Sequence, residues 1–340
     1  MRIAIATDAW QPQINGVVRT LGQTVAHLTE LGHEVRVISP QDFRTYPCPT
    51  YPSIRLAAFP KRGVRRALQA FRPQAIHIAT EGPIGHATRS LCCNMSLPFT
   101  TSYHTQFPEY VRARVPLPVS WSYAYLRRYH SRAARTMVAT NSMRQRLEER
   151  GFRNLEIWER GVDATLFQPG PKSYLPGPRP ISMYMGRVAV EKNIEAFLRL
   201  ELPGSKYVVG DGPDLNRLRA LYPDVRFVGL KLGQELTAHL AAADVFVFPS
   251  LTDTFGLVLL EAMACGVPVA AFPVTGPIDV VQQGKTGMLD HDLRKAVIGA
   301  LNLYPADCVA YAQQHSWRNW TERFASLLEP FEEKRWDEGE

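Results

Sequence analysis

The chain carries two successive series of short apolar runs that alternate with amphipathic stretches. Such alternation predicts a parallel sheet with helices on both faces. In the first half we expect strands at Ile3–Ala6, Glu34–Ile38, Ile76–Ile78, Phe99–Tyr103 and Thr136–Ala139, and helices at Gly16–Leu31, Val64–Phe71 and Ser142–Arg150. In the second half we expect strands at Ile181–Met185, Lys206–Val209, Val225–Val228, Val245–Phe248 and Val267–Ala271. The pattern therefore predicts an α/β protein with two doubly wound domains, and 340 residues suffice for both cores.

A segment rich in proline and glycine separates the two series. Residues 168–180 contain five prolines and two glycines, which disfavour helix and central strand. We therefore expect an N-terminal domain at 1–167, a linker at 168–180 and a C-terminal domain at 181–315. Residues 316–331 show helical spacing of Trp317, Trp320, Phe324, Leu327 and Leu328, so we expect a helix that packs back on the first domain. Two domains of similar size are expected to face each other across a cleft.

Composition limits the compartment and the partners. The five cysteines form no CxxC pair and no metal-ligand spacing, which favours a reducing compartment. The N-terminus lacks a signal-peptide layout, and no apolar run approaches the roughly 20 residues needed to span a bilayer, so we expect a cytoplasmic or peripheral protein. The net charge is +7, yet residues 1–165 hold 22 basic and 11 acidic residues, whereas 166–340 hold 17 and 21. This asymmetry favours an anionic partner, either membrane or nucleic acid.

Much of the basic excess lies in residues 109–137, here called the basic-aromatic belt. Its arginines and aromatic residues are Arg112, Arg114, Arg127, Arg128, Arg132 and Arg135, with Tyr110, Trp121, Tyr123, Tyr125 and Tyr129 between them. A second basic cluster consists of Lys61, Arg62, Arg65 and Arg66. Arginine combined with Trp and Tyr suits the interface of an anionic bilayer. The alternative is a solvated helix face with buried rings.

Two carboxylates, Asp253 and Glu261, stand eight positions apart. A predicted strand ending at Pro249 precedes them, and Thr254, Phe255, Gly256 and an apolar run lie between them. The pair therefore brackets a strand–loop–helix corner, where ligands bind in open α/β sheets and where backbone N–H groups suit a phosphate. The alternative is a helix with one N-terminal acid and one exposed glutamate.

Two more loops follow predicted strands of the second half. In Gly186–Asn193, Arg187 offers a planar donor fork and Lys192 a point charge, which together can neutralise a diphosphate. The alternative is a solvated loop in which Glu191 pairs with one of them. In Val208–Pro213, Gly210 and its neighbours let a nucleotide lie close, but no full GxGxxG pattern is present, which argues against an NAD site.

The first half contributes weaker signals. Asn15 and Gly16, after the first strand, can adopt positive φ and so allow close approach of a phosphate or sugar. His104 follows the Phe99–Tyr103 strand, and Glu81 holds an equivalent position on the preceding strand. In the second half, Asp290-His291-Asp292 could suggest a metal site, but we interpret it as a solvated turn.

Together these motifs resemble family-4 retaining glycosyltransferases of the GT-B fold, including bacterial glycolipid synthases and lipid or glycan mannosyltransferases. The resemblance extends from Asp8 to about Leu328 and is most specific at Gly186–Asn193, Val209–Pro213 and Ser250–Pro268. It implies two Rossmann-like domains facing across a cleft.

The resemblance also implies roles for individual residues. Arg187 and Lys192 would hold the donor diphosphate, His104 would face the donor sugar, and Glu261 would hold the ribose. Asp253 would face the sugar hydroxyls. The remaining donor-binding positions implied are Asn15, Gly16, Gly186, Gly210, Gly229, Thr254, Phe255 and Gly256.

Two positions depart from the family pattern. Asp253 stands where the family usually has Glu, and one fewer methylene draws the carboxylate back by about 1.5 Å. Asn15-Gly16 stands where Gly-Gly is common, and Asn can satisfy a left-handed conformation there.

The implied reaction is transfer of a hexose, such as glucose or glucuronic acid, from a nucleotide-sugar to a hydroxyl with retention of configuration. We expect a UDP-linked donor, a membrane lipid acceptor such as diacylglycerol, no metal and no other cofactor, at the inner face of the cell membrane. The alternatives are a GDP-mannose-dependent mannosyltransferase, a related epimerase or phosphorylase, and a nucleic-acid-binding protein. No nucleic-acid-binding motif supports the last of these.

Overall fold

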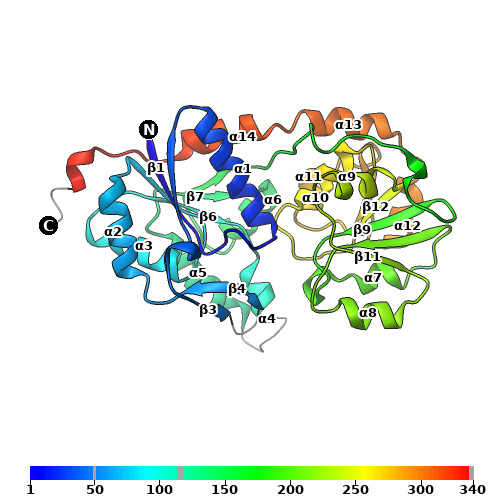
Figure 1. Cartoon of the computed structure of the whole chain (residues 1–340), viewed down its shortest axis with the longest axis horizontal. Helices are drawn as coiled ribbons and strands as arrows, with labels where there is room; N and C mark the ends of the chain where they lie inside the picture. The colour runs from blue at the N-terminus through cyan, green and yellow to red at the C-terminus, as the bar shows by residue number, and fades with distance from the viewer. Residues whose placement is uncertain (49–50, 113–117, 337–340) are drawn as a thin grey trace. The chain divides into compact units, whose positions relative to one another are not determined.

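The computed structural model describes residues 1–48, 51–112 and 118–336, and the chain divides into two compact units (Figure 1). Unit 1 comprises Met1–Glu159 and Trp317–Glu340, and unit 2 comprises Arg160–Ser316. Each unit contains a six-stranded parallel sheet. The predicted α/β class with two doubly wound domains is therefore confirmed.

Unit 1 has the strand order β2-β1-β5-β6-β7-β8. Its strands are β1 (Arg2–Ala6), β2 (Glu34–Ile38), β5 (Ala75–Ile78), β6 (Thr100–Tyr103), β7 (Arg135–Val138) and β8 (Leu155–Ile157), with an antiparallel pair β3 (Thr45–Cys48) and β4 (Tyr51–Ala57). Its helices are α1 (Gly16–Glu30), α2 (Lys61–Phe71), α3 (Pro83–Asn94), α4 (Phe107–Arg112), α5 (Val119–His130), α6 (Asn141–Glu148) and α14 (Trp317–Leu327), with short 3₁₀ helices η1 (Pro40–Asp42) and η4 (Glu333–Trp336).

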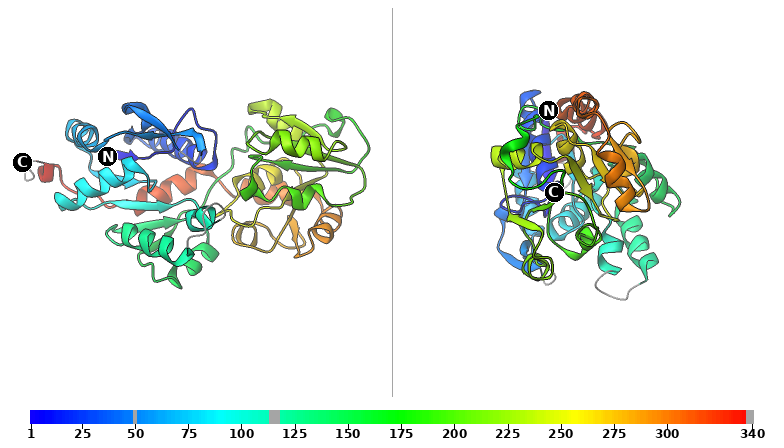
Figure 2. Two further views of the ribbon diagram at one scale, coloured as in Figure 1. Left: turned by 90° about the horizontal axis from the view of Figure 1, so that it is seen from below. Right: turned by 90° about the vertical axis from the view of Figure 1, so that its right-hand side faces the viewer.

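Alternate residues of β1 build two separate cores on the two faces of this sheet. Ile3 and Ile5 pack in one cluster with α1 and α14, whereas Ala4 and Ala6 pack in another with α2 and α3. Helices on both faces are visible in Figure 2. Because both faces are buried, the strand is apolar throughout, as parallel strands usually are. Helix α14 belongs to unit 1 because its Phe324 is fully buried there.

Unit 2 repeats this arrangement with the order β11-β10-β9-β12-β13-β14. Its strands are β9 (Ile181–Met185), β10 (Ser205–Val209), β11 (Arg226–Gly229), β12 (Val245–Phe248), β13 (Val269–Ala271) and β14 (Gly287–Leu289). Its helices are α7 (Glu195–Leu198), α8 (Leu215–Leu221), α9 (Gly233–Ala241), α10 (Leu257–Ala264), α11 (Pro277–Val280), α12 (Leu293–Ala300) and α13 (Pro305–Gln313), with 3₁₀ helices η2 (Lys172–Tyr174) and η3 (Val190–Lys192).

The segment rich in proline and glycine, 168–180, lies within unit 2. Lys172 Nζ donates a hydrogen bond to the carbonyl of Ala241 (2.9 Å), and Arg179 donates to the carbonyl of Ala242 (3.0 Å). These carbonyls end helix α9, where cationic side chains are favourable. The segment is therefore anchored to unit 2, and the chain passes between the units at Glu159/Arg160 and again at Ser316/Trp317.

Within residues 1–48, 51–112 and 118–336, every helix is too short or too polar to cross a bilayer.

Candidate active site

In unit 2, the strand order changes direction between the neighbouring strands β9 and β12. The chain leaves β9 towards β10 on one side and leaves β12 towards β13 on the other. Loops that diverge at such a switch point leave a crevice at the carboxyl ends of the strands, where α/β proteins bind ligands. The two loops that begin there are Gly186–Asn193 and Pro249–Gly256.

Side-chain contacts join these two loops. Lys192 Nζ lies 2.5 Å from Asp253 Oδ1. Asn193, whose φ is +51°, donates from Nδ2 to the carbonyl of Pro249 (3.0 Å). Thr252 Oγ1 donates to the carbonyl of Glu191 (3.3 Å). The fold thus brings together Lys192 and Asp253, which the sequence analysis found in separate motifs.

Glycines let the backbones of neighbouring loops touch. Gly186 has φ +153° and Gly210 has φ +142°. A Cβ on Gly210 would lie 1.9 Å from the carbonyl oxygen of Gly186, so no other residue fits without a backbone shift. Gly229, in contrast, has φ +76° and no atom within 4 Å of its Cβ position. Loop packing therefore explains Gly210 at this site, whereas Gly229 faces open space.

The Asp253–Glu261 corner has the expected strand–loop–helix form. Gly256 caps α10 with φ +85°, and Phe255 is buried beside it. Glu261 lies within α10 and is 4% exposed, so the alternative of an exposed glutamate is wrong. Burial of a carboxylate costs free energy unless polar or charged groups compensate, which makes Glu261 a candidate site residue.

The corresponding switch point of unit 1 lies between β1 and β5. Gly16 begins α1 here, and Asn15 is its N-cap. The expectation of positive φ at Asn15 is wrong, because its φ is −157°. Its Oδ1 instead accepts hydrogen bonds from the N–H groups of Val17 and Val18, both at 3.0 Å. Satisfying the first N–H groups of α1 is why Asn stands at this position.

Asp8, also at this switch point, has a structural role that the sequence analysis missed. Its carboxylate accepts hydrogen bonds from Thr80 Oγ1 (2.9 Å) and from the N–H groups of Ile84 (2.9 Å) and Gly85 (3.3 Å). Asp8 therefore caps α3 and ties the loop after β1 to the loop after the neighbouring strand β5. Burial raises its pKa to about 6, although these hydrogen bonds act in the opposite direction.

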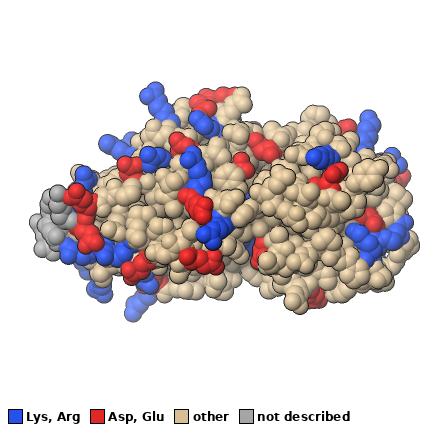
Figure 3. Space-filling model, turned by 90° about the horizontal axis from the view of Figure 1, so that it is seen from above, with Lys and Arg blue, Asp and Glu red and all other residues tan. Residues whose placement is uncertain are grey.

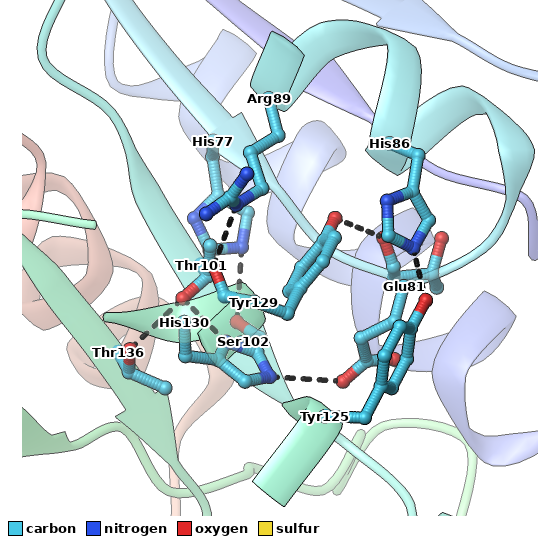
Figure 4. A network of polar contacts seen from close by, with 11 residues as sticks. His77, Glu81, His86, Arg89, Thr101, Ser102, Tyr125, Tyr129, His130 and Thr136 are labelled. Atoms are coloured by element: carbon cyan, nitrogen blue, oxygen red, sulfur yellow. Dashed lines mark hydrogen bonds and ion pairs between the residues drawn. The ribbon is translucent and has the colours of Figure 1, made fainter. Parts of the chain in front are cut away.

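A chain of polar contacts continues across unit 1 (Figure 4). His130 Nε2 lies 3.2 Å from Glu81 Oε1, and His130 Nδ1 lies 2.9 Å from Thr101 Oγ1. Thr101 Oγ1 in turn lies 3.0 Å from Thr136 Oγ1. This series of polar contacts links β7, β6, the end of α5 and the loop after β5. It therefore fixes the position of the Glu81 side chain.

His104 follows β6 directly and is half-buried. Its ring packs edge-on against the buried Trp158, with ring centroids 5.8 Å apart and an interplanar angle of 69°. Trp158 follows β8, so two strand ends determine the orientation of the imidazole.

The structure divides the basic-aromatic belt into buried and exposed parts. On α5, Tyr123 and Tyr129 are buried, whereas Trp121 and Tyr125 are 70% and 50% exposed. Tyr123 donates to Glu109, which also pairs with Arg146. Arg114 lies outside the described residues. On the face drawn in Figure 3, basic and acidic side chains are interspersed.

The second basic cluster forms one face of α2. Lys61, Arg62, Arg65 and Arg66 are exposed, while Val64 and Leu68 are buried in the core of unit 1. Phe59, in the loop before the helix, is 97% exposed. The cluster is therefore a continuous basic surface preceded by an apolar side chain.

Asp290 and Asp292 have local structural roles. Asp292 caps α12 by accepting from the N–H of Arg294 (3.0 Å), and Asp290 Oδ1 accepts from the N–H of Asp292 (2.8 Å). In the described parts of the chain, no three His, Cys, Asp or Glu side chains are grouped as metal ligands.

The two halves of the chain match two different family models. Residues 14–166 match the family model for Glycosyltransferase Family 4, and residues 179–303 match that for glycosyl transferases group 1. A GDP-mannose-dependent alpha-mannosyltransferase of Mycolicibacterium smegmatis is 32% identical, over 85% of this chain and 84% of that protein. The chain belongs to glycosyltransferase family 4.

A glycolipid synthase and a solved structure are also similar to this glycosyltransferase. The alpha-monoglucosyldiacylglycerol synthase of Streptococcus pneumoniae is 26% identical, over 90% of this chain and 79% of that protein. The crystal structure of HepE from Anabaena with UDP-glucose has a TM-score of 0.70 at 15% identity, covering 96% of this chain and 98% of that one. The glycosyltransferase therefore has the GT-B fold, as the sequence predicted.

Proposed function

We propose that this glycosyltransferase moves a hexose from a nucleotide-sugar to a hydroxyl group of a membrane lipid, with retention of configuration and without a metal. The observation that carries the proposal is the pairing of Lys192 with Asp253 at the switch point of unit 2. This contact sets a cation and a carboxylate side by side, at a place where α/β folds bind nucleotides.

The donor would be held by groups with different chemistry. Arg187 and Lys192 suit the diphosphate because fixed positive charge stabilises the negative charge that develops on the leaving group. Gly256 has no side chain to cap the first N–H groups of α10, and these groups would bind a phosphate or sugar oxygen. Glu261 would accept hydrogen bonds from the ribose, and Asp253 from the sugar hydroxyls. Gly186, Gly229, Thr254 and Phe255 would contribute backbone contacts, and Gly210 would keep the neighbouring loop close.

For the chemical step we propose front-face attack. The bond from the anomeric carbon to the diphosphate oxygen breaks, the acceptor oxygen bonds to the same face, and the acceptor proton passes to the leaving phosphate. In unit 1, His104 would face the donor sugar, and Asn15 and Gly16 would present the start of α1. No protein nucleophile is needed, which agrees with the assignment of Asp253 to sugar binding.

For the donor we propose GDP-mannose, which is the alternative rather than the first expectation of the sequence analysis. The name of the Mycolicibacterium relative supports it, at 32% identity. A UDP-linked hexose is the second candidate, supported by the name of the glucosyldiacylglycerol synthase and by the likeness to HepE.

The test of this proposal is transfer from a panel of GDP- and UDP-linked sugars to lipid acceptors, including diacylglycerol, with the product's anomeric configuration read by NMR. Transfer of mannose with retention supports the proposal. Transfer from UDP-hexoses alone would favour the second candidate, and inversion would contradict the mechanism.

We propose that the protein reaches its lipid acceptor by peripheral contact of helix α2 with the membrane surface. Its basic face and the exposed Phe59 combine charge attraction with an apolar anchor, at roughly 1 kcal/mol per basic residue near an anionic surface. Binding to anionic vesicles should weaken with salt and with Arg62→Gln plus Arg66→Gln. An equal charge change at Arg144 and Arg153, on another part of unit 1, should have little effect. Equal losses in the two pairs would exclude α2 as the contact surface.

A further inference from the structure

A hollow lined by arginine lies at the opposite edge of unit 1 from its switch point. Its cavity volume is about 740 Å³, and its charged lining residues are Arg89, Arg128, Arg132 and Arg335. Phe99, which precedes β6, and the last turns of α3 and α5 also line it, so it lies at the amino ends of the strands. His104, at the carboxyl end of β6, belongs to the other edge.

The lining has strong positive charge. No Asp or Glu is among the lining residues that the structure describes. Within the described ranges, none of the four arginines forms an ion pair with a carboxylate. In the nearby C-terminal segment, Glu333 pairs with Arg2 and Glu329 pairs with Arg135. Among the described residues, no ion pair therefore neutralises the arginines of the hollow.

Backbone carbonyls orient part of this arginine set. Arg89 donates from Nε to the carbonyl of Tyr129 (2.8 Å) and from Nη2 to that of Arg128 (3.1 Å), at the end of α5. Its place beside Tyr129 is visible in Figure 4. Arg335 donates from Nη1 to the carbonyl of Ser96 (3.1 Å). A guanidinium has five N–H donors, so both side chains keep donors for a ligand while the backbone holds them in place.

We infer that this hollow binds a phosphate-bearing ligand at a site separate from the donor site. The arginine fork matches phosphate oxygens in pairs, and the volume lies within the range of small-molecule sites, roughly 300–1,000 Å³. The ligand is either a free di- or polyphosphate or the headgroup of an anionic phospholipid. This inference does not depend on the donor or acceptor proposed above.

Cys93 gives a local readout, because it lines the hollow and is exposed. The probe is pyrophosphate, and the measurement is the rate of alkylation of Cys93 by iodoacetamide in the full chain, with Cys48 as internal reference and sodium chloride at matched ionic strength. At pyrophosphate concentrations of ten times Kd, the alkylation rate of Cys93 should fall about tenfold. Vesicles of phosphatidylglycerol, compared with phosphatidylcholine, test the headgroup source in the same way.

Variants separate this site from the others. Arg128→Gln plus Arg132→Gln should abolish the protection, whereas Arg144→Gln plus Arg153→Gln should retain it. Arg187→Ala, in unit 2, should also retain it, because the donor diphosphate site is distinct. If only pyrophosphate protects Cys93 from alkylation, the ligand is a free phosphate compound. If only phosphatidylglycerol vesicles protect Cys93, the ligand is a lipid headgroup.

Three results would overturn the inference. The first is no protection by either probe, and the second is protection that survives Arg128→Gln plus Arg132→Gln. The third concerns residues 337–340, which include three acids. If pyrophosphate protects Cys93 only in a variant that ends at Trp336, these acids compete with the ligand in the native chain. The hollow would then not be a phosphate site of the full chain.

Discussion

The two units place polar residues at the same point of their folds but hold them differently. At the switch point of unit 2, a charged pair and backbone contacts join two loops, and Lys192 and Asp253 remain partly accessible, with side chains 20% and 17% exposed. At the switch point of unit 1, Asp8 is buried and its carboxylate accepts hydrogen bonds from the N–H groups at the start of helix α3. The comparison shows that the charged pair of unit 2 stays partly accessible, whereas Asp8 of unit 1 is buried and fixes its loops.

The largest effect on activity is expected when a charge is removed from the proposed donor site of unit 2. Arg187→Ala should lower transfer by about 10²–10³-fold or more, because an electrostatic contact to the leaving group is worth several kcal/mol. Glu261→Ala should also abolish transfer, with the far-UV spectrum unchanged. Arg199→Ala, on the surface of the same unit, is the matched control and should keep activity. Full activity in Arg187→Ala would contradict the assignment of the site.

A second experiment measures the contact between the two loops. Lys192→Ala and Asp253→Ala should each reduce transfer strongly, and the double variant should lose less than the sum of the two. The expected coupling is about 1–3 kcal/mol, as for residues in direct contact. Kinetics of the four proteins, read as kcat/KM, give this value. Additive losses would mean that the 2.5 Å contact does not matter to catalysis.

A third experiment measures how the contribution of Asp8 to stability depends on pH. The folded-state pKa of Asp8 is about 6, above its ordinary value of 3.8. Its contribution to stability is therefore fully present below pH 3.8 and is lost as the pH rises through 6. Asp8→Asn carries no titrating proton, so its stability relative to the native chain should be about 1 kcal/mol better at pH 7 than at pH 5. Urea unfolding at the two pH values measures this, and an equal difference at both would exclude the effect.

The smallest effect concerns the cap of α1. Asn15→Ala should cost about 1 kcal/mol of unfolding free energy, and Asn15→Ser should cost little, since Ser keeps the capping oxygen. Thermal unfolding of both variants measures the difference. If Asn15→Gly proved more stable than the native chain, a positive φ would be indicated instead of the extended value observed.

Local patterns predicted most strands and the unit 2 motifs because each depends on neighbouring residues. The run Val245–Phe248 is apolar throughout since both faces of its sheet are buried. The hairpin β3–β4 and the edge strands β8 and β14 were not predicted. Strands β3, β8 and β14 are short, and in β4 Pro52, Ser53 and Arg55 interrupt the apolar residues. Segment 168–180 could not be assigned to unit 2 from its composition, since contacts with residues distant in the sequence hold it there, among them the carbonyls that end α9 and the side chain of Arg226.

The sequence by itself determined the two α/β domains and the loops that carry Arg187, Lys192, Asp253 and Glu261, because strand periodicity and loop chemistry are local. Only the tertiary structure decided which of these groups meet. Lys192 and Asp253 are 61 positions apart, Asp8 and Ile84 are 76 apart, and Arg89 and Tyr129 are 40 apart. Their contacts follow from strand order and helix packing, which bring distant segments to one edge of a sheet and which no local pattern encodes.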